Sequence, residues 1–198
     1  MVTTCCRSVR GVLALTNVGG GRPERQVVAR GKFHNVCFAV RADGTEPARA
    51  FLEALRRGIW EPDPDAEEIP CDEQIRDCDW FFAAIRHWAK TGEPQYTRAV
   101  NDLEDGVWEF KHGAKRLSFY DTDGQGGYTA KLRIQDSEDA IPGDFWDIPY
   151  FDREIRLGHA FPKVSQMTTP FDIDETLQVR EEDLEHDRPA GEELHRGD

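Results

Sequence analysis

Alternating apolar and polar residues first appear in the stretch FHNVCFAVRADG, residues 33–44. Val36, Phe38 and Val40 occupy every second position, and an Asp-Gly pair follows them. Side chains of a strand point alternately to its two faces, so this pattern predicts a half-buried strand that ends in a turn. The preceding stretch NVGGGRPERQ is typical of a flexible linker, so we expect the folded part to begin after about Gly31.

Helical spacing replaces alternation in the next two segments. Thr45 is a suitable N-cap for the first, PARAFLEALRRG, which has Pro47 in its first turn and ends before Gly58. The second, CDEQIRDCDWFFAAIRHWAKTG, is closed by Gly92. Its apolar residues recur at helical spacing, and they are Ile75, Cys78, Phe82, Ile85 and Ala89. The pattern therefore predicts a strand followed by two helices.

Two further strands are predicted on either side of a short reversal at Gly113. GVWEFKH and KRLSFYD flank a Gly-Ala pair, which favours a β-hairpin. Trp108 and Phe110 would share one side of their strand, as Leu117 and Phe119 would share one side of theirs. The opposite side would include Lys111, Arg116, Ser118 and Tyr120. The hairpin therefore has an apolar side and a cationic side.

Residues 122–153 interrupt this regular order. We expect YTAKLRI, residues 128–134, to form an extra strand and IPGDFWDIPYF, residues 141–151, to form a loop anchored by its aromatic rings. The alternating stretch after them predicts a strand with Ile155, Leu157, His159 and Phe161 on one face. A last amphipathic helix is expected after Thr169 and Pro170, with a face made of Ile173, Leu177, Arg180 and Leu184.

Charge is distributed unevenly along the chain. The net charge is −13, yet residues 1–32 hold six basic groups against Glu24 alone, so this segment carries +5 and the remainder −18. An acidic body repels nucleic acid at long range, so any function on RNA needs a local cationic site.

Several classes of site are not indicated by the sequence. The five cysteines include no Cys-x-x-Cys pair, so we expect neither a disulfide framework nor a zinc site. There is no phosphate-cradling glycine motif and no nucleophile elbow, and we expect no cofactor. No apolar run is long enough for a membrane span or a signal-peptide core, so we expect a cytoplasmic protein without membrane contact.

Three stretches carry a family resemblance. They are the strand that leads into PARAFLEALRRG, the hairpin VWEFKHGAKRLSFYDTDG with its Arg-x-x-Phe-Tyr pattern, and IRLGHAFPKVSQMTTPFDIDETLQVREEDL. In this order the chain resembles the RelE/ParE superfamily of small toxins, specifically its HigB-like, phage-associated branch. The resemblance implies an α+β fold: a small antiparallel sheet packed against two N-terminal helices, with a C-terminal helix. The toxin domain would span 33–186 with an insert at 122–153, between a flexible basic tail at 1–32 and a polar tail at 187–198.

The resemblance also implies a function. A HigB-like toxin of a type II toxin-antitoxin system cleaves messenger RNA on the ribosome without a metal, and a cognate antitoxin, expected to be of the helix-turn-helix type, holds it inactive. Such cleavage needs a base for the 2′-hydroxyl, positive charge at the phosphate and an acid for the leaving oxygen. The candidate cations on the sheet are Lys163, Arg116 and Lys111, which could reach one phosphate.

Proton transfer has several candidates. His159 and His112 are the ring bases near these segments, and Glu109 or Asp121 could serve instead. Tyr120 could orient a ribose or stack a base. Structural roles remain open for the same residues: His159 as a core histidine, Arg116 as the partner of an acid, and Lys111 and His112 as solvated side chains.

Some positions depart from the family pattern. Lys163 is followed by Val164 where the family has a second lysine, Met167 stands where another lysine is common, and Ala160 replaces a glycine. With the acidic body, these departures support a second hypothesis: a catalytically inactive binding protein of the same fold, either a phage-derived inhibitor or a ParE-like topoisomerase binder. A structural phage protein unrelated to toxins is a third hypothesis.

Overall fold

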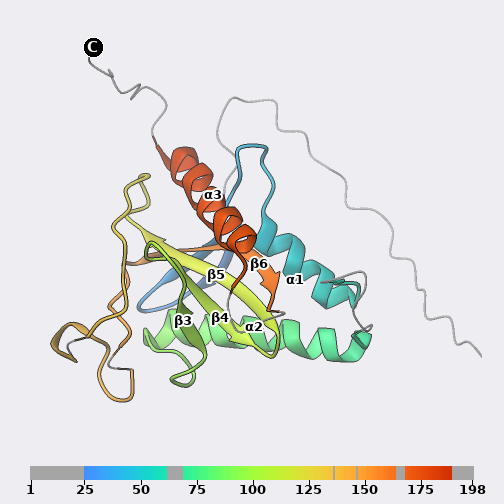
Figure 1. Cartoon of the computed structure of the whole chain (residues 1–198), viewed down its shortest axis with the longest axis horizontal. Helices are drawn as coiled ribbons and strands as arrows, with labels where there is room; N and C mark the ends of the chain where they lie inside the picture. Colours follow the sequence, from blue (N-terminus) through green and yellow to red (C-terminus); the bar gives the residue numbers. More distant parts are fainter. Residues whose placement is uncertain (1–24, 62–68, 136, 146, 164–167, 189–198) are drawn as a thin grey trace, which may run out of the picture.

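The computed structural model describes residues 25–61, 69–135, 137–145, 147–163 and 168–188. In these ranges a six-stranded sheet has α1 and α2 on one face and α3 on the other (Figure 1). The strands are β1 Val27–Arg30, β2 Asn35–Phe38, β3 Val100–Asp102, β4 Trp108–His112, β5 Lys115–Thr122 and β6 Glu154–Pro162. The helices are α1 Pro47–Arg57, α2 Cys71–Thr91 and α3 Pro170–Asp187, with a 3₁₀ turn at Ser137–Asp139. The α+β class is confirmed.

The sheet is mixed rather than antiparallel. Its strand order is β1-β2-β6-β5-β4-β3, and β2 pairs with β6 in parallel while the other neighbours are antiparallel. Parallel neighbours need a long crossover, which α1, α2 and the strands β3 to β5 provide between β2 and β6. The expectation of a wholly antiparallel sheet is therefore wrong at this pair.

The fold begins before the expected boundary at residue 32. β1 pairs with β2, with Val27 opposite Cys37 and Arg30 opposite Asn35. Arg25, just before β1, forms ion pairs with Asp183 and Asp187 of α3. Residues 25–32 therefore belong to the domain, while 1–24 and the end of the expected C-terminal tail, 189–198, lie outside the described residues.

The first helix ends as predicted but begins differently. Gly58 adopts the left-handed conformation with φ 67°, which favours glycine, and closes α1. The N-cap is Glu46, without a side-chain cap, and not Thr45. The Thr45 backbone N–H and hydroxyl instead donate to the Asp43 carboxylate at 2.9 and 2.6 Å. A local turn therefore uses the groups that a helix cap would need.

The buried face of α2 is rotated from the predicted one. Ile75 is 43% exposed, whereas Gln74 and Asp77 are buried together with Phe81 and Trp88. Gln74 can be buried because its side chain accepts from the Trp60 N–H at 2.8 Å and donates to the Ile69 carbonyl at 2.9 Å. Polar residues with local partners thus occupy positions that a hydrophobic pattern assigns to solvent.

Aromatic rings fill the core between the sheet and the helices α1 and α2. Trp88 packs against Phe110, Phe119 and Phe151, with ring centroids 5.3 to 5.8 Å apart. Phe151 belongs to the loop after the 3₁₀ turn, so the prediction of a loop anchored by a ring is confirmed. The predicted strand at 128–134 is wrong. The backbone of this segment is instead hydrogen-bonded to a side chain of β4, since the Trp108 indole N–H donates to the Lys131 carbonyl at 2.6 Å.

A β-bulge in β6 divides residues between the two faces of the sheet that strict alternation would place on a single face. Leu117 lies opposite Ala160 and Phe119 opposite Leu157, so two residues of β6 face Ser118 alone. Leu157 therefore points into the core beneath α1 and α2, as Ile155 does. His159 and Phe161 lie on the other face, with their rings stacked 5.8 Å apart. The predicted common face for all four residues is wrong.

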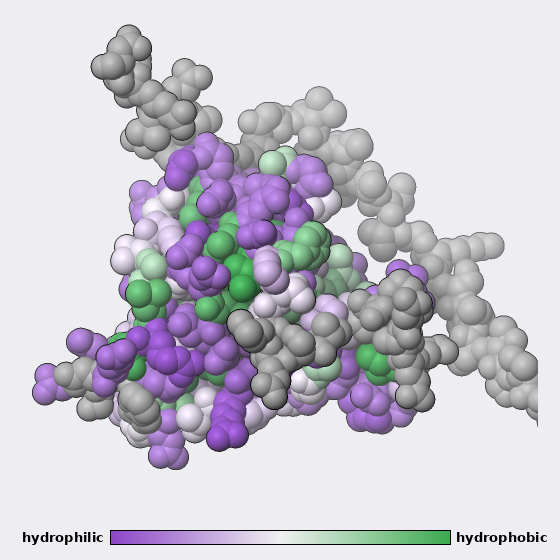
Figure 2. Space-filling view, viewed as in Figure 1, coloured by the Kyte–Doolittle hydropathy of each residue, from purple (hydrophilic) through white to green (hydrophobic). Residues whose placement is uncertain are grey.

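The last helix begins at the predicted residues. Thr169 is the N-cap of α3 and its hydroxyl accepts the Asp172 N–H at 3.1 Å, with Pro170 in the first turn. Its buried face is made of Thr176, Val179, Arg180, Asp183 and Leu184. Hydrophilic side chains cover much of the face seen in Figure 2, with apolar residues in small groups between them. Among the described residues, no helix is both long enough and apolar enough to cross a bilayer.

Candidate functional site

Three of the predicted cations meet at one end of the sheet, on the face opposite α1 and α2. Lys111 of β4 lies directly opposite Arg116 of β5, which in turn lies opposite Phe161 of β6. Lys163 follows β6 and is fixed there because its backbone N–H donates to the Ala114 carbonyl at 2.6 Å. We call Lys111, Arg116 and Lys163 the cation cluster.

Glu109 is the carboxylate inside this cluster. It has no exposed surface, and its Oε1 lies 3.4 Å from the Arg116 Nε. Neither of its oxygens accepts a hydrogen bond of good geometry in the described part of the chain, although the Asn101 side chain is near enough to lower its pKa, and that Nε also lacks a hydrogen-bond partner. Burial raises the pKa of Glu109, although Arg116, Lys163 and Lys111 each oppose the rise. The site therefore holds an imperfectly satisfied buried charge, which is uncommon in a purely structural core.

Burial also affects the two cations nearest to Glu109. It lowers the pKa of Lys111, and the Glu109 carboxylate opposes this change. Burial likewise lowers the pKa of Arg116, whose guanidinium donates to the Gly113 and Lys115 carbonyls at 2.8 and 2.9 Å. Arg116 is thus both paired with an acid and fixed to the hairpin turn, so its predicted structural role is present and its orientation is set.

His159 lies on the same face as the cation cluster. It is half-buried, and its Nε2 is 3.8 Å from the Asp172 Oδ1 at the start of α3. Burial lowers the pKa of His159, and the Asp172 charge opposes the shift. Its backbone N–H donates to the Ser118 Oγ at 2.8 Å, which fixes the bulge. The imidazole is therefore neutral near pH 7 and can accept a proton.

His112 does not join this site. It points to the opposite face, where its ring stacks on Trp80 with centroids 4.3 Å apart and its Nε2 lies 2.9 Å from the Asp77 Oδ1. Lys115 Nζ occupies the other Asp77 oxygen at 2.6 Å. The prediction that groups His112 with the other candidates is wrong, because successive residues of β4 point to opposite faces.

Tyr120 is on the correct face but is covered. It has no exposed surface, and its hydroxyl donates to the Asp183 Oδ2 at 2.8 Å. Burial and the Asp183 charge raise the pKa of Tyr120 well above its ordinary value. It therefore cannot stack an RNA base or contact a ribose in this structure, and the predicted role is corrected to a structural one.

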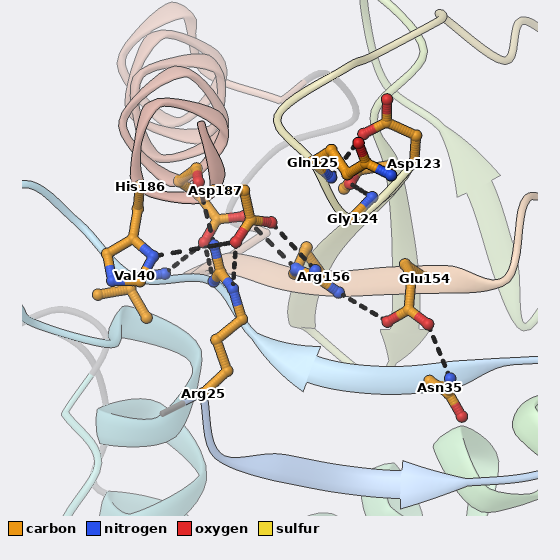
Figure 3. A network of polar contacts seen from close by, with 12 residues as sticks. Arg25, Asn35, Val40, Asp123, Gly124, Gln125, Glu154, Arg156, His186 and Asp187 are labelled. Carbon is orange, nitrogen blue, oxygen red and sulfur yellow. Dashed lines mark hydrogen bonds and ion pairs between the residues drawn. The ribbon is translucent and has the colours of Figure 1, made fainter. Parts of the chain in front are cut away.

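The partners of Tyr120 belong to a polar network that sequence reasoning missed. Arg156 is 3% exposed, and it pairs with Glu154 at 3.4 Å and with Asp187 at 3.1 Å. Figure 3 shows Arg25 and Arg156 on either side of Asp187. Arg25 donates from its Nε to the Asp187 Oδ1 at 2.9 Å. The network fixes α3 to β6 and to the start of the domain, and the position of Arg156 between two core residues was its only signal in the sequence.

No group of three or more His, Cys, Asp or Glu side chains in the described ranges is arranged to hold a metal ion. Cys37, Cys71 and Cys78 are free thiols. The comparisons add no relative: no protein-family model matches the chain, and no curated protein matches it.

Proposed function

We propose that this protein is a divergent HigB-like toxin of the RelE/ParE superfamily that cleaves messenger RNA without a metal. The observation that carries the proposal is the cation cluster around the buried Glu109 carboxylate. Three positive side chains close together are unusual in a molecule with a net charge of −13, and they suit a phosphodiester. The RelE/ParE kinship is part of the proposal. It is supported by the succession of β2, two helices, the β4–β5 hairpin, β6 and α3, to which this chain adds β1 and β3.

The chemistry follows from the protonation states. The neutral His159 accepts the proton of a 2′-hydroxyl, and the 2′-oxygen attacks the adjacent phosphorus. Arg116 and Lys163 stabilise the charge that develops on the phosphoryl oxygens. Lys111 gives a proton to the departing 5′-oxygen, a step that its lowered pKa favours. The products are a 2′,3′-cyclic phosphate and a 5′-hydroxyl, so atoms and charges balance.

Glu109 acts on the cations rather than on the RNA. Because it has no exposed surface, substrate reaches the cation cluster first. Its charge keeps Lys111 protonated against the effect of burial, and its ion pair aims the Arg116 guanidinium. Glu109 is therefore a positioning residue in this proposal, and an antitoxin would inactivate the protein by covering this face.

The test is cleavage of messenger RNA in a translation reaction that contains the purified full chain, with transcript ends mapped. We expect Lys111→Ala, Arg116→Ala and His159→Gln each to reduce cleavage by about 10²–10³-fold. Arg57→Ala is the control, since it removes an exposed positive charge at the end of α1, on the other face of the sheet. Circular dichroism and thermal unfolding verify that each variant is folded.

The alternative binding function predicts a different result. Departures at Lys163 and its neighbours support it, although Val164 and Met167 lie outside the described residues. If induced expression stops growth, no new transcript ends appear, and the cluster variants retain the effect, then the nuclease proposal is wrong and the protein acts by binding another protein.

A further inference from the structure

A pocket opens beside the cation cluster, at the β3 edge of the sheet. It has a volume of about 430 Å³, within the range of pockets that hold small ligands. Its polar lining comes from three segments: Arg98 from the loop before β3, Asn101 and Lys111 from β3 and β4, and Arg133 and Asp147 from the insert. The insert therefore completes a pocket that the sheet alone would leave open.

The pocket is positively charged. Arg98, Lys111 and Arg133 line it against Asp147 alone, and that carboxylate is already bound by the Arg133 guanidinium. Arg98 is exposed, and no carboxylate of the described residues lies within ion-pair distance of it. Since the whole molecule is acidic, this local excess of positive charge attracts an anion rather than a neutral ligand.

Arg133 is held in a fixed orientation. Its Nη2 donates to the Asn101 Oδ1 at 2.9 Å, and its guanidinium lies 5.7 Å from the centre of the Trp108 ring. Together with the Asp147 ion pair, these contacts fix the guanidinium plane before any ligand arrives. The positive charges of Arg98 and Lys111 are then the ones that the pocket offers to an anion.

The pocket and the cation cluster are continuous. Lys111 belongs to both, and Asn101 lies directly opposite Glu109 in the pairing of β3 with β4. Neighbouring β-strands of a sheet lie about 5 Å apart, so the pocket beside β3 is within one or two such spacings of the cation cluster on β4 and β5, and proteins hold single-stranded nucleic acid in cationic grooves that follow its backbone. A single-stranded RNA with one phosphate on the cation cluster can therefore place its next phosphate in the pocket.

We propose that the β3-edge pocket binds the nucleotide next to the cleaved phosphate of a single-stranded RNA. This inference rests on the proposed nuclease function. Arg98 binds the phosphate, Lys111 lies between it and the cleaved phosphate, and the fixed guanidinium plane of Arg133 offers a surface on which the base stacks. Phosphate contacts do not depend on the base, so the pocket increases affinity for any sequence.

The test measures binding of the full-length His159→Gln variant to a short single-stranded RNA by fluorescence anisotropy at several salt concentrations. We expect Arg98→Ala in this background to weaken binding about 5–20-fold. The plot of the logarithm of the association constant against the logarithm of the salt concentration should become less steep by about 0.7, the value for one lost phosphate contact on a single strand. In the otherwise unchanged protein, Arg98→Ala should raise the KM for RNA and leave kcat unchanged.

Arg57→Ala is again the matched control, because it removes the same charge far from the pocket. If Arg98→Ala binds RNA like Arg57→Ala while the wild-type protein cleaves RNA, the pocket proposal is overturned and the nuclease proposal stands. If the wild type cleaves no RNA but Arg98→Ala still reduces the affinity and the salt slope, the nuclease proposal fails and the pocket remains a nucleic-acid site.

Discussion

At the scale of single residues, buried carboxylates differ in how they are neutralised. Asp183 accepts hydrogen bonds from the Tyr120 hydroxyl and the Val40 N–H at 2.8 and 2.7 Å, and Arg25 pairs with it. One oxygen of Asp121 accepts the Asp152 N–H at 2.6 Å and lies 3.9 Å from the Lys131 Nζ, while its other oxygen has no hydrogen-bond partner among the described residues. Asp121 is therefore, like Glu109, a carboxylate whose ionisation the fold opposes.

Asp121 gives a prediction about pH. Burial raises its pKa from 3.8 to about 6, so the folded protein binds more protons than the unfolded chain between these values. The contribution of Asp121 to the free energy of unfolding is therefore largest near pH 4, where the carboxyl is protonated in the folded protein, and it is lost as the pH rises through 6. The loss amounts to about 3 kcal/mol at 1.4 kcal/mol per unit. The Asp121→Asn variant has no ionisable group at this position, so the position adds no pH dependence to its free energy of unfolding.

Urea unfolding of both proteins at about pH 4.5 and pH 8 measures the effect. The difference in unfolding free energy between the variant and the wild type should shift in favour of the variant by about 2 kcal/mol between these two values. The comparison removes the contributions of other carboxylates, such as Glu182, because they are common to both proteins. A difference that stays constant with pH would show that Asp121 is ionised at no cost.

At the scale of the elements, the bulge in β6 decides which side chains face the candidate site. It moves His159 to the face of the cation cluster while Leu157 stays in the core. Gly158 permits the bulge to lie close to β5, because a Cβ at this position would be 2.7 Å from the Ser118 Oγ. That oxygen already accepts the His159 N–H, so it cannot move freely.

The prediction is that Gly158→Ala destabilises the protein by about 1–3 kcal/mol through overpacking. Because the clash is with one hydroxyl, the penalty should be at least about 1 kcal/mol smaller when the change is made in a Ser118→Ala background. Thermal and urea unfolding of the four proteins in this double-mutant cycle give the coupling. Additive effects would mean that the backbone of β6, rather than Ser118, limits the space.

At the scale of the whole molecule, the beginning of the domain and its last helix are fixed to each other. Arg25 bonds to the Asp183 and Asp187 carboxylates, and β1 extends the sheet beyond β2. Arg156 joins the same acids from β6. The two ends of the described chain thus share one buried set of charges.

A shortened chain tests this connection. A chain beginning at Phe33 loses both β1 and Arg25, which leaves the buried Asp183 short of one cation. We expect it to be less stable than a chain beginning at Arg25 by about 3–5 kcal/mol, the usual result of removing one partner of a buried pair. Equal urea midpoints for the two chains would show that β1 and Arg25 contribute nothing to the fold.

Much of the fold could be predicted because its signals are local. The hairpin, the helix stops at Gly58 and Gly92, and the cap at Thr169 depend on residues within one turn of each other. The site was predicted less well. Strand parity found Lys111 and Arg116, and it also places His112 on the opposite face, so grouping His112 with them went against parity. Parity failed for His159 because its strand contains a bulge.

The sequence by itself determined the two central helices, the hairpin with its apolar and cationic sides, the last strand and helix, and the acidic character of the body, but not β1 or β3. Only the tertiary structure decided that β2 and β6 are parallel, that Tyr120 is covered, and that the insert closes a pocket beside Lys111. The physical reason is the distance along the chain between partners. Backbone conformation is set by neighbouring residues, whereas the burial of a polar group depends on a partner such as Asp183, which is 63 residues away from Tyr120.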